Sequence, residues 1–157
     1  MNTNRKTAVI TGVIFIIATL MGPILAAPLL PALTGTDYLT QVSAHPNQAA
    51  IGVLLIIIGY LACAGIAVVM YPVLKKWNAG LALGSVVFRT IETAFYMVGL
   101  VSLMSLVTLG QQFTTAGAAD RASLQAIGDL LVSVKNHAGL VAVFAFCLGA
   151  FMYYYLF

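Results

Sequence analysis

Four long apolar stretches, separated by short polar segments, make up most of the chain. A helix needs about 20 apolar residues to cross the roughly 30 Å hydrocarbon core of a bilayer. The stretches reach that length and cover about residues 8–30, 49–74, 79–109 and 138–157. The pattern therefore predicts an all-α fold: one transmembrane domain over residues 1–157, forming an integral membrane four-helix bundle. Pro23, Pro28 and Pro31 should kink or fray the outer half of the first helix.

The first polar interruption, residues 34–48, predicts a short external amphipathic helix. Thr36 or Asp37 is suited to cap it, because each side-chain oxygen can accept a hydrogen bond from a free backbone N–H. Pro46 should end this helix, since a residue that precedes proline disfavours the α conformation. Asn47 is then expected to cap the second membrane span.

The second polar interruption, residues 111–129, predicts another external amphipathic segment. After Asp120, apolar residues recur at helical spacing, which indicates a helix that approaches the membrane with a polar back; they are Leu124, Ile127, Leu131 and Val134. Lys135–His137 should mark the outer interface, where the fourth span begins.

The composition supports a membrane protein. Of 157 residues, 62% are hydrophobic and 7% are charged, whereas a soluble domain carries about 25% charged residues. These values exclude a soluble protein, a disordered chain and a nucleic-acid binder, despite the net charge of +3. The expected partner is the lipid bilayer, with a second copy of the chain or other membrane helices as further candidates.

The basic residues predict the orientation in the membrane. Arg5 and Lys6 precede the first span, and Lys75 and Lys76 follow the second. Two crossings separate these pairs, so both pairs can lie on one side. Cytoplasmic loops collect Lys and Arg, which places the N-terminus in the cytoplasm. The short turn at Lys75–Asn78 makes spans two and three an antiparallel hairpin.

Two opposite charges lie inside the third span. A charge at the centre of a bilayer costs at least about 2.5–3.5 kcal/mol, so it is expected to face the bundle and to be paired. Arg89 and Glu92 are three residues apart and share one helix face. Thr93 and Tyr96 continue that face. These four residues are the candidate ligand-binding residues.

The face containing Arg89 allows two interpretations. In the first, it handles a small molecule or an ion: Arg89 binds an anionic or carbonyl group, Glu92 takes up a cation or proton, and Tyr96 orients the ligand. In the second, Arg89 and Glu92 satisfy each other and fix the rotation of the helix. The protein would then be a non-catalytic structural or interaction subunit of a membrane complex. Small residues such as Gly80 and Gly84 would pack against neighbouring helices.

Catalytic signatures are missing from the sequence. It has no GxSxG, HExxH, P-loop or dinucleotide fingerprint, so no catalytic residue, metal site or cofactor is predicted and an enzyme is the less favoured class. Cys63 and Cys147 lack any metal-type spacing and are expected to be free thiols that pack as small apolar groups.

Residues 71–109 resemble DUF4386, a bacterial multi-pass membrane family of unknown function. The family pattern is carried here by Tyr71–Lys75 (Tyr-Pro-Val-Leu-Lys), Gly80–Gly84 (Gly-Leu-Ala-Leu-Gly) and Phe88-Arg89-x-x-Glu92. The resemblance implies a location in the bacterial plasma membrane. It implies no activity.

Overall fold

The computed structural model describes residues 3–31, 33, 35 and 37–156, and within them every regular element is a helix. Four helical segments, Arg5–Leu29, Pro46–Leu74, Ala79–Thr115 and Ala118–Tyr154, are long and apolar enough to cross a membrane. They form a bundle, which confirms the predicted fold class. The elements in chain order are α1 (Thr3–Thr19), η1 (Leu20–Ala26), η2 (Ala27–Leu29), α2 (Tyr38–Ala44), α3 (Pro46–Leu74), α4 (Ala79–Thr115) and α5 (Ala118–Tyr154).

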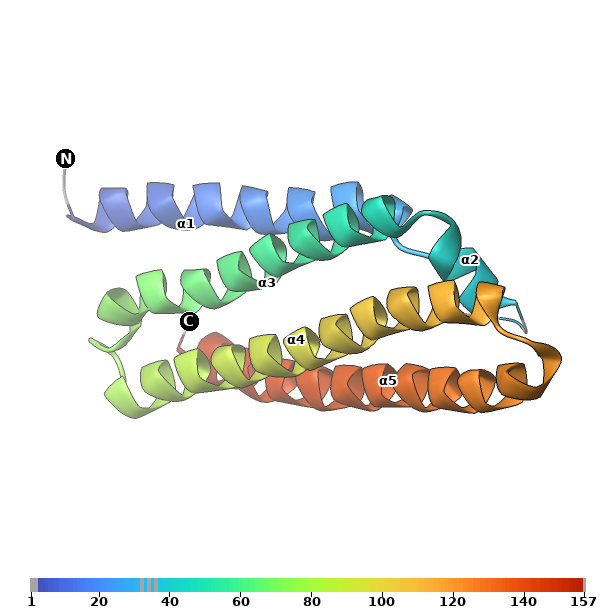
Figure 1. The fold of residues 1–157 in the computed structure, drawn as a ribbon. Coiled ribbons are helices and arrows are strands. Elements are labelled where there is room, and N and C mark those ends of the chain that lie inside the picture. The colour runs from blue at the N-terminus through green and yellow to red at the C-terminus, as the bar shows by residue number, and fades with distance from the viewer. Residues whose placement is uncertain (1–2, 32, 34, 36, 157) are drawn as a thin grey trace.

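The helices form two antiparallel pairs, α1 with α3 and α4 with α5 (Figure 1). The described parts of both chain termini and the turn at Lys75–Asn78 lie at one end of the bundle. The short helix α2 and the turn between α4 and α5 lie at the other end. The side chain of Asn78 caps α4 by accepting a hydrogen bond from the Leu81 backbone N–H at 3.0 Å.

Proline changes the helix type in the outer half of the first span. Regular α-helix ends at Thr19 and gives way to the π-helical η1, which contains Pro23. The 3₁₀ segment η2 follows with Pro28 in its first turn, and the chain becomes extended at Leu30. Because each proline removes a backbone donor, the regular hydrogen-bond ladder cannot continue, which agrees with the expected kink.

The second polar interruption does not form a separate helix. α5 is continuous from Ala118 to Tyr154, so Lys135–His137 lie in the middle of a helix and not at its start. No proline interrupts this stretch. Of its apolar positions, Leu124 and Leu131 contact the buried core at the α2 end, whereas Ile127 and Val134 are exposed. The amphipathic segment and the fourth span therefore follow one another on the same axis.

The cap expected for the second span is also different. α3 begins at Pro46, one residue before Asn47, and His45 is at the N-cap position. Proline suits the first helical position, since its missing N–H would have no partner there. Asp37 precedes α2 but forms no side-chain cap bond, and Thr36 lies outside the described residues.

The face of α5 that meets α4 consists of small residues. Every buried residue described on α5 is alanine or glycine: Gly128, Ala138, Ala142, Ala145 and Gly149. At Gly149, a Cβ atom would come within 3.2 Å of Phe88 Cβ and 3.6 Å of the Ser85 carbonyl oxygen. Small residues let helix backbones approach closely, which is how membrane helices gain packing energy. α4 and α5 therefore form the most extensive helix contact.

A buried apolar core holds α2 against the far end of this pair. Tyr38, Leu39 and Val42 of α2 pack against Leu106 and Val107 of α4. The Tyr38 hydroxyl also donates a 2.8 Å hydrogen bond to Asp129 Oδ1 on α5. Burial and the hydrogen bond to this carboxylate both raise the pKa of Tyr38 above its ordinary value, so the hydroxyl keeps its proton.

Two glycines that sequence spacing did not single out make this docking feasible. A Cβ atom on Gly110 would collide with the Leu39 carbonyl oxygen, and one on Gly128 would meet the Tyr38 hydroxyl. Of the two glycines that were expected to pack against a neighbouring helix, Gly84 faces the Met152 side chain of α5. A Cβ on Gly80 would meet only the neighbouring Asn78. Gly110 and Gly128 are thus the close-approach positions of the α2 end.

Replacement of Gly110 by alanine should destabilise the protein. Because the new Cβ meets backbone rather than a flexible side chain, Gly110→Ala should lower the free energy of unfolding by about 1–3 kcal/mol. Gly139→Ala is the matched control, since it is also helical and has open space around its Cβ. It should be neutral or stabilising by up to about 1 kcal/mol. Thermal unfolding in detergent measures both, and equal transition temperatures would contradict the packing argument.

Candidate functional site

Arg89 and Glu92 form an ion pair on α4, as their spacing predicts. Arg89 Nη1 donates a hydrogen bond to Glu92 Oε2 at 3.0 Å. The Glu92 side chain is 8% exposed and the Arg89 side chain is 26% exposed. The carboxylate is therefore buried behind the guanidinium, and the guanidinium is the accessible member of the pair.

Phe146 of α5 fixes the guanidinium from a second helix. The Arg89 Cζ atom lies 4.5 Å from the centre of the Phe146 ring, within the range of a cation–π contact. The close approach of the two helices at Gly149 brings the α5 backbone to the same level, since a Cβ there would lie 3.7 Å from the Arg89 backbone nitrogen. Arg89 is thus held by one partner on its own helix and one on α5.

Thr93 and Tyr96 join α4 to α3. The Thr93 hydroxyl donates to the Arg89 carbonyl at 2.9 Å and lies 3.4 Å from the Tyr60 carbonyl. Tyr96 stacks on Tyr60, with ring centres 4.2 Å apart and an angle of 4° between the planes. Both residues therefore bind the helices together, and neither belongs to the cavity that Arg89 lines.

A cavity of about 840 Å³ lies between the two helix pairs. Arg89 and Ser85 of α4 line it together with Phe146 of α5, Thr11 of α1 and Cys63 of α3. The rest of the lining is mainly apolar. The volume falls within the range of about 300–1,000 Å³ that is usual for small-molecule sites. Of the four candidate residues named from the sequence, Arg89 alone lines this space.

The Arg89 guanidinium retains hydrogen-bonding capacity in this cavity. A guanidinium has five N–H donors, and within the described residues Arg89 uses one of them, in its bond to Glu92. Ser85 of the same helix, by contrast, donates to the Ala82 carbonyl at 2.8 Å. The Thr11 hydroxyl oxygen on α1 has no hydrogen-bond partner within the same residues, but neighbouring atoms cover it completely. Arg89 therefore carries the free donors at this cavity.

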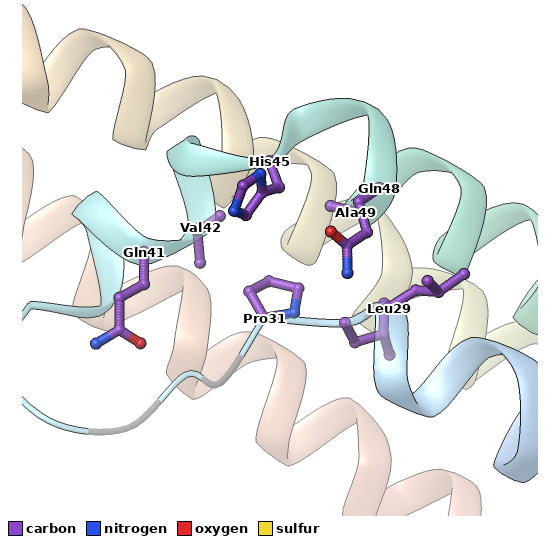
Figure 2. A pocket seen from close by; sticks show the side chains of 8 residues that line it. Leu29, Pro31, Gln41, Val42, His45, Gln48 and Ala49 are labelled. Atoms are coloured by element: carbon purple, nitrogen blue, oxygen red, sulfur yellow. The ribbon is translucent and has the colours of Figure 1, made fainter.

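A second, smaller cavity of about 110 Å³ lies at the α2 end. Figure 2 shows the His45 ring and the Gln48 amide on the side of the α2–α3 junction that faces Pro31. This volume is far below the range of small-molecule sites and suits a few water molecules.

The remaining histidine and the cysteines carry no recognisable site. Nδ1 of His137 lies 2.8 Å from the Ser133 carbonyl oxygen on the same helix. Within the described residues, no group of three or more His, Cys, Asp and Glu is arranged to hold a metal ion. Cys63 and Cys147 are free thiols, as expected, but Cys147 is exposed on the outer surface of α5 rather than packed inside. An apolar helix has a lipid-facing side, and Cys147 lies on it.

The fold and cavity define an integral membrane helical bundle with an arginine-lined cavity that is partly open at the surface of the bundle. The family model described as a domain of unknown function, DUF4386, matches residues 10–157. The chain therefore belongs to the DUF4386 family, which confirms the resemblance noted in the sequence. No curated protein matches the chain. No solved structure matches it either.

Removal of Arg89 alone should destabilise the protein more than removal of the whole pair. Arg89→Met leaves the buried Glu92 carboxylate without its partner. Losses of about 3–5 kcal/mol are typical for a fully buried pair and about 0–1 kcal/mol for an exposed one. The partial exposure of Arg89 leads us to expect about 2 kcal/mol.

The double variant Arg89→Met/Glu92→Met should recover most of that stability, because two apolar side chains replace both charges. Thermal unfolding of both variants in detergent checks this. A double variant that is less stable than Arg89→Met would show that Glu92 has a more important partner than Arg89.

Proposed function

We propose that the protein binds a small amphiphilic molecule in the membrane, with the Arg89 guanidinium holding the polar group of that molecule. The observation that carries this proposal is an incompletely bonded guanidinium at the wall of a large and otherwise mainly apolar cavity. Ionisable residues inside membrane spans are costly and commonly mark binding or transport sites. The proposal concerns binding alone, because transport would require a second conformation of the protein.

The packing of α1 supports entry of the molecule from the bilayer. α1 packs mainly on α3 and η1, and no comparable contact joins α1 to α5 within the described residues, although both helices line the cavity together with α3 and α4. Its side between α1 and α5 therefore has little helix packing to close it. A lipid-soluble molecule could enter there without crossing the polar ends of the bundle.

The distribution of charge supports a cytoplasmic N-terminus. The start of α1, which contains Arg5 and Lys6, and the α3–α4 turn, which contains Lys75 and Lys76, lie at the same end of the bundle (Figure 1). No acidic residue lies at that end, while Asp37 and Asp120 belong to the opposite end. Excess positive charge is characteristic of cytoplasmic loops.

Cysteine labelling tests this orientation. In a background without Cys63 and Cys147, we would place one cysteine at Gly117, in the α4–α5 turn, or at the exposed Trp77. A membrane-impermeant maleimide should label Gly117→Cys in intact cells and Trp77→Cys only after permeabilisation. The reverse pattern would overturn the proposed orientation.

Native mass spectrometry from nanodiscs tests binding. The wild type should carry an additional mass beyond bulk lipid, and the mass should disappear in Arg89→Met/Glu92→Met, which is expected to remain folded. Arg121→Met is the matched control: Arg121 also lies over a phenylalanine, Phe113 at 5.5 Å, but at the exposed far end. Loss of the bound mass in both variants would argue against a site at Arg89.

A second candidate function, a structural or interaction subunit, is favoured by a different observation. The charges of Arg89 and Glu92 already neutralise each other, and Phe146 holds the guanidinium in place, so the pair could fix helix rotation without any ligand. The same spectra distinguish the two candidates. A subunit role predicts oligomers or complexes without a specific additional mass. In that case the spectra of the double variant should match those of the wild type.

A further inference from the structure

The charge balance around Arg89 restricts the kind of molecule that the cavity can hold. We infer that the ligand is an uncharged amphiphile whose polar head is a hydrogen-bond acceptor of the carbonyl class, and not an anion. This inference rests on the proposed function. It concerns the chemical class of the ligand at the same site.

The site is already neutral before a ligand binds. The positive charge of Arg89 is matched by Glu92 at 3.0 Å, and among the residues that the structure describes Arg89 is the one charged residue that lines the cavity. Lys135 contacts Gly99, ten residues beyond Arg89 on α4 and about 15 Å away along the helix. An anionic head would therefore give the site a net negative charge in apolar surroundings, which is strongly unfavourable. An uncharged acceptor keeps the balance.

The available groups fit an acceptor. Arg89 keeps N–H donors that are not used by Glu92, and guanidinium groups can only donate. A carbonyl oxygen accepts two hydrogen bonds, so it suits a guanidinium that offers more than one free N–H.

The depth of the site agrees with an uncharged head. Arg89 is ten residues from the start of α4 at Ala79, which places it about 15 Å along the helix from the basic end of the bundle. A hydrocarbon core is about 30 Å thick, so this level is well below the interface where charged lipid heads reside. The mainly apolar walls leave room for the tail of the ligand.

A pair of photoreactive probes tests the inference. Both carry the same diazirine-bearing alkyl chain; one ends in a methyl ketone and the other in a sulfonate, which stays anionic at any working pH. Each is titrated into wild-type protein in phosphatidylcholine nanodiscs, and labelled peptides are mapped by mass spectrometry. The ketone should label cavity-lining segments of α1 and α5 saturably, at a concentration at least about tenfold lower than the sulfonate.

Glu92→Gln should reverse this preference. The amide keeps an oxygen that accepts the Arg89 hydrogen bond but removes the negative charge, so the site becomes net positive. We expect half-saturation by the sulfonate to shift at least about tenfold toward lower concentration relative to the ketone. Asp120→Asn is the control, because it makes the same change of charge on an exposed residue far from the cavity. It should leave the preference unchanged.

The outcomes separate the inference from the proposed function. Saturable labelling of the wild-type cavity with preference for the sulfonate would overturn the uncharged ligand and leave binding at Arg89 standing. An unchanged ketone preference in a folded Glu92→Gln variant would overturn the charge-balance argument. If neither probe labels the cavity saturably, the proposed function itself fails.

Discussion

α4 and α5 lie against each other over nearly their full length, and the other elements depend on this contact. The contact is close because the buried positions of α5 are alanine and glycine, so the α5 backbone lies directly against residues of α4 such as Phe88. Lipid is as apolar as the side chains, so membrane helices gain their association energy from packing of this kind. At one end the pair forms the platform on which α2 docks through Leu39 and the Tyr38–Asp129 hydrogen bond.

The same contact gives Arg89 its surroundings. Gly149 allows α5 to approach the backbone of α4 at the level of Arg89, and Phe146, three residues earlier, then lies beneath the guanidinium. The Glu92 carboxylate, which forms the ion pair with this guanidinium, is more deeply buried than Arg89. The result is a cation that is held in place but not fully bonded. It faces the space that the looser packing of α1 leaves open.

The two halves of the bundle therefore differ in how closely they are packed. The α2 end has a continuous buried core and two glycines that tolerate no side chain, while the end that holds the chain termini contains the large cavity. A closely packed end and a loosely closed one are compatible with the binding that we propose. Under that proposal, the pair α4–α5 would hold the Arg89 guanidinium in position for the polar group of the ligand.

The sequence by itself determined the features that depend on local spacing. Stretches of about 20 apolar residues predict the four spans, the prolines predict an irregular outer half of the first span, and the three-residue spacing of Arg89 and Glu92 predicts their contact. It misplaced the start of the last helix, because the polar residues near Lys135 interrupt the hydrophobicity without breaking the backbone. Only the tertiary structure decided which side of each helix faces a partner. Thr11, Ser85 and Phe146 join Arg89 at the cavity through the rotation and crossing of α1, α4 and α5. Those angles are set by close packing between residues far apart in the chain, which no spacing along one helix can reveal.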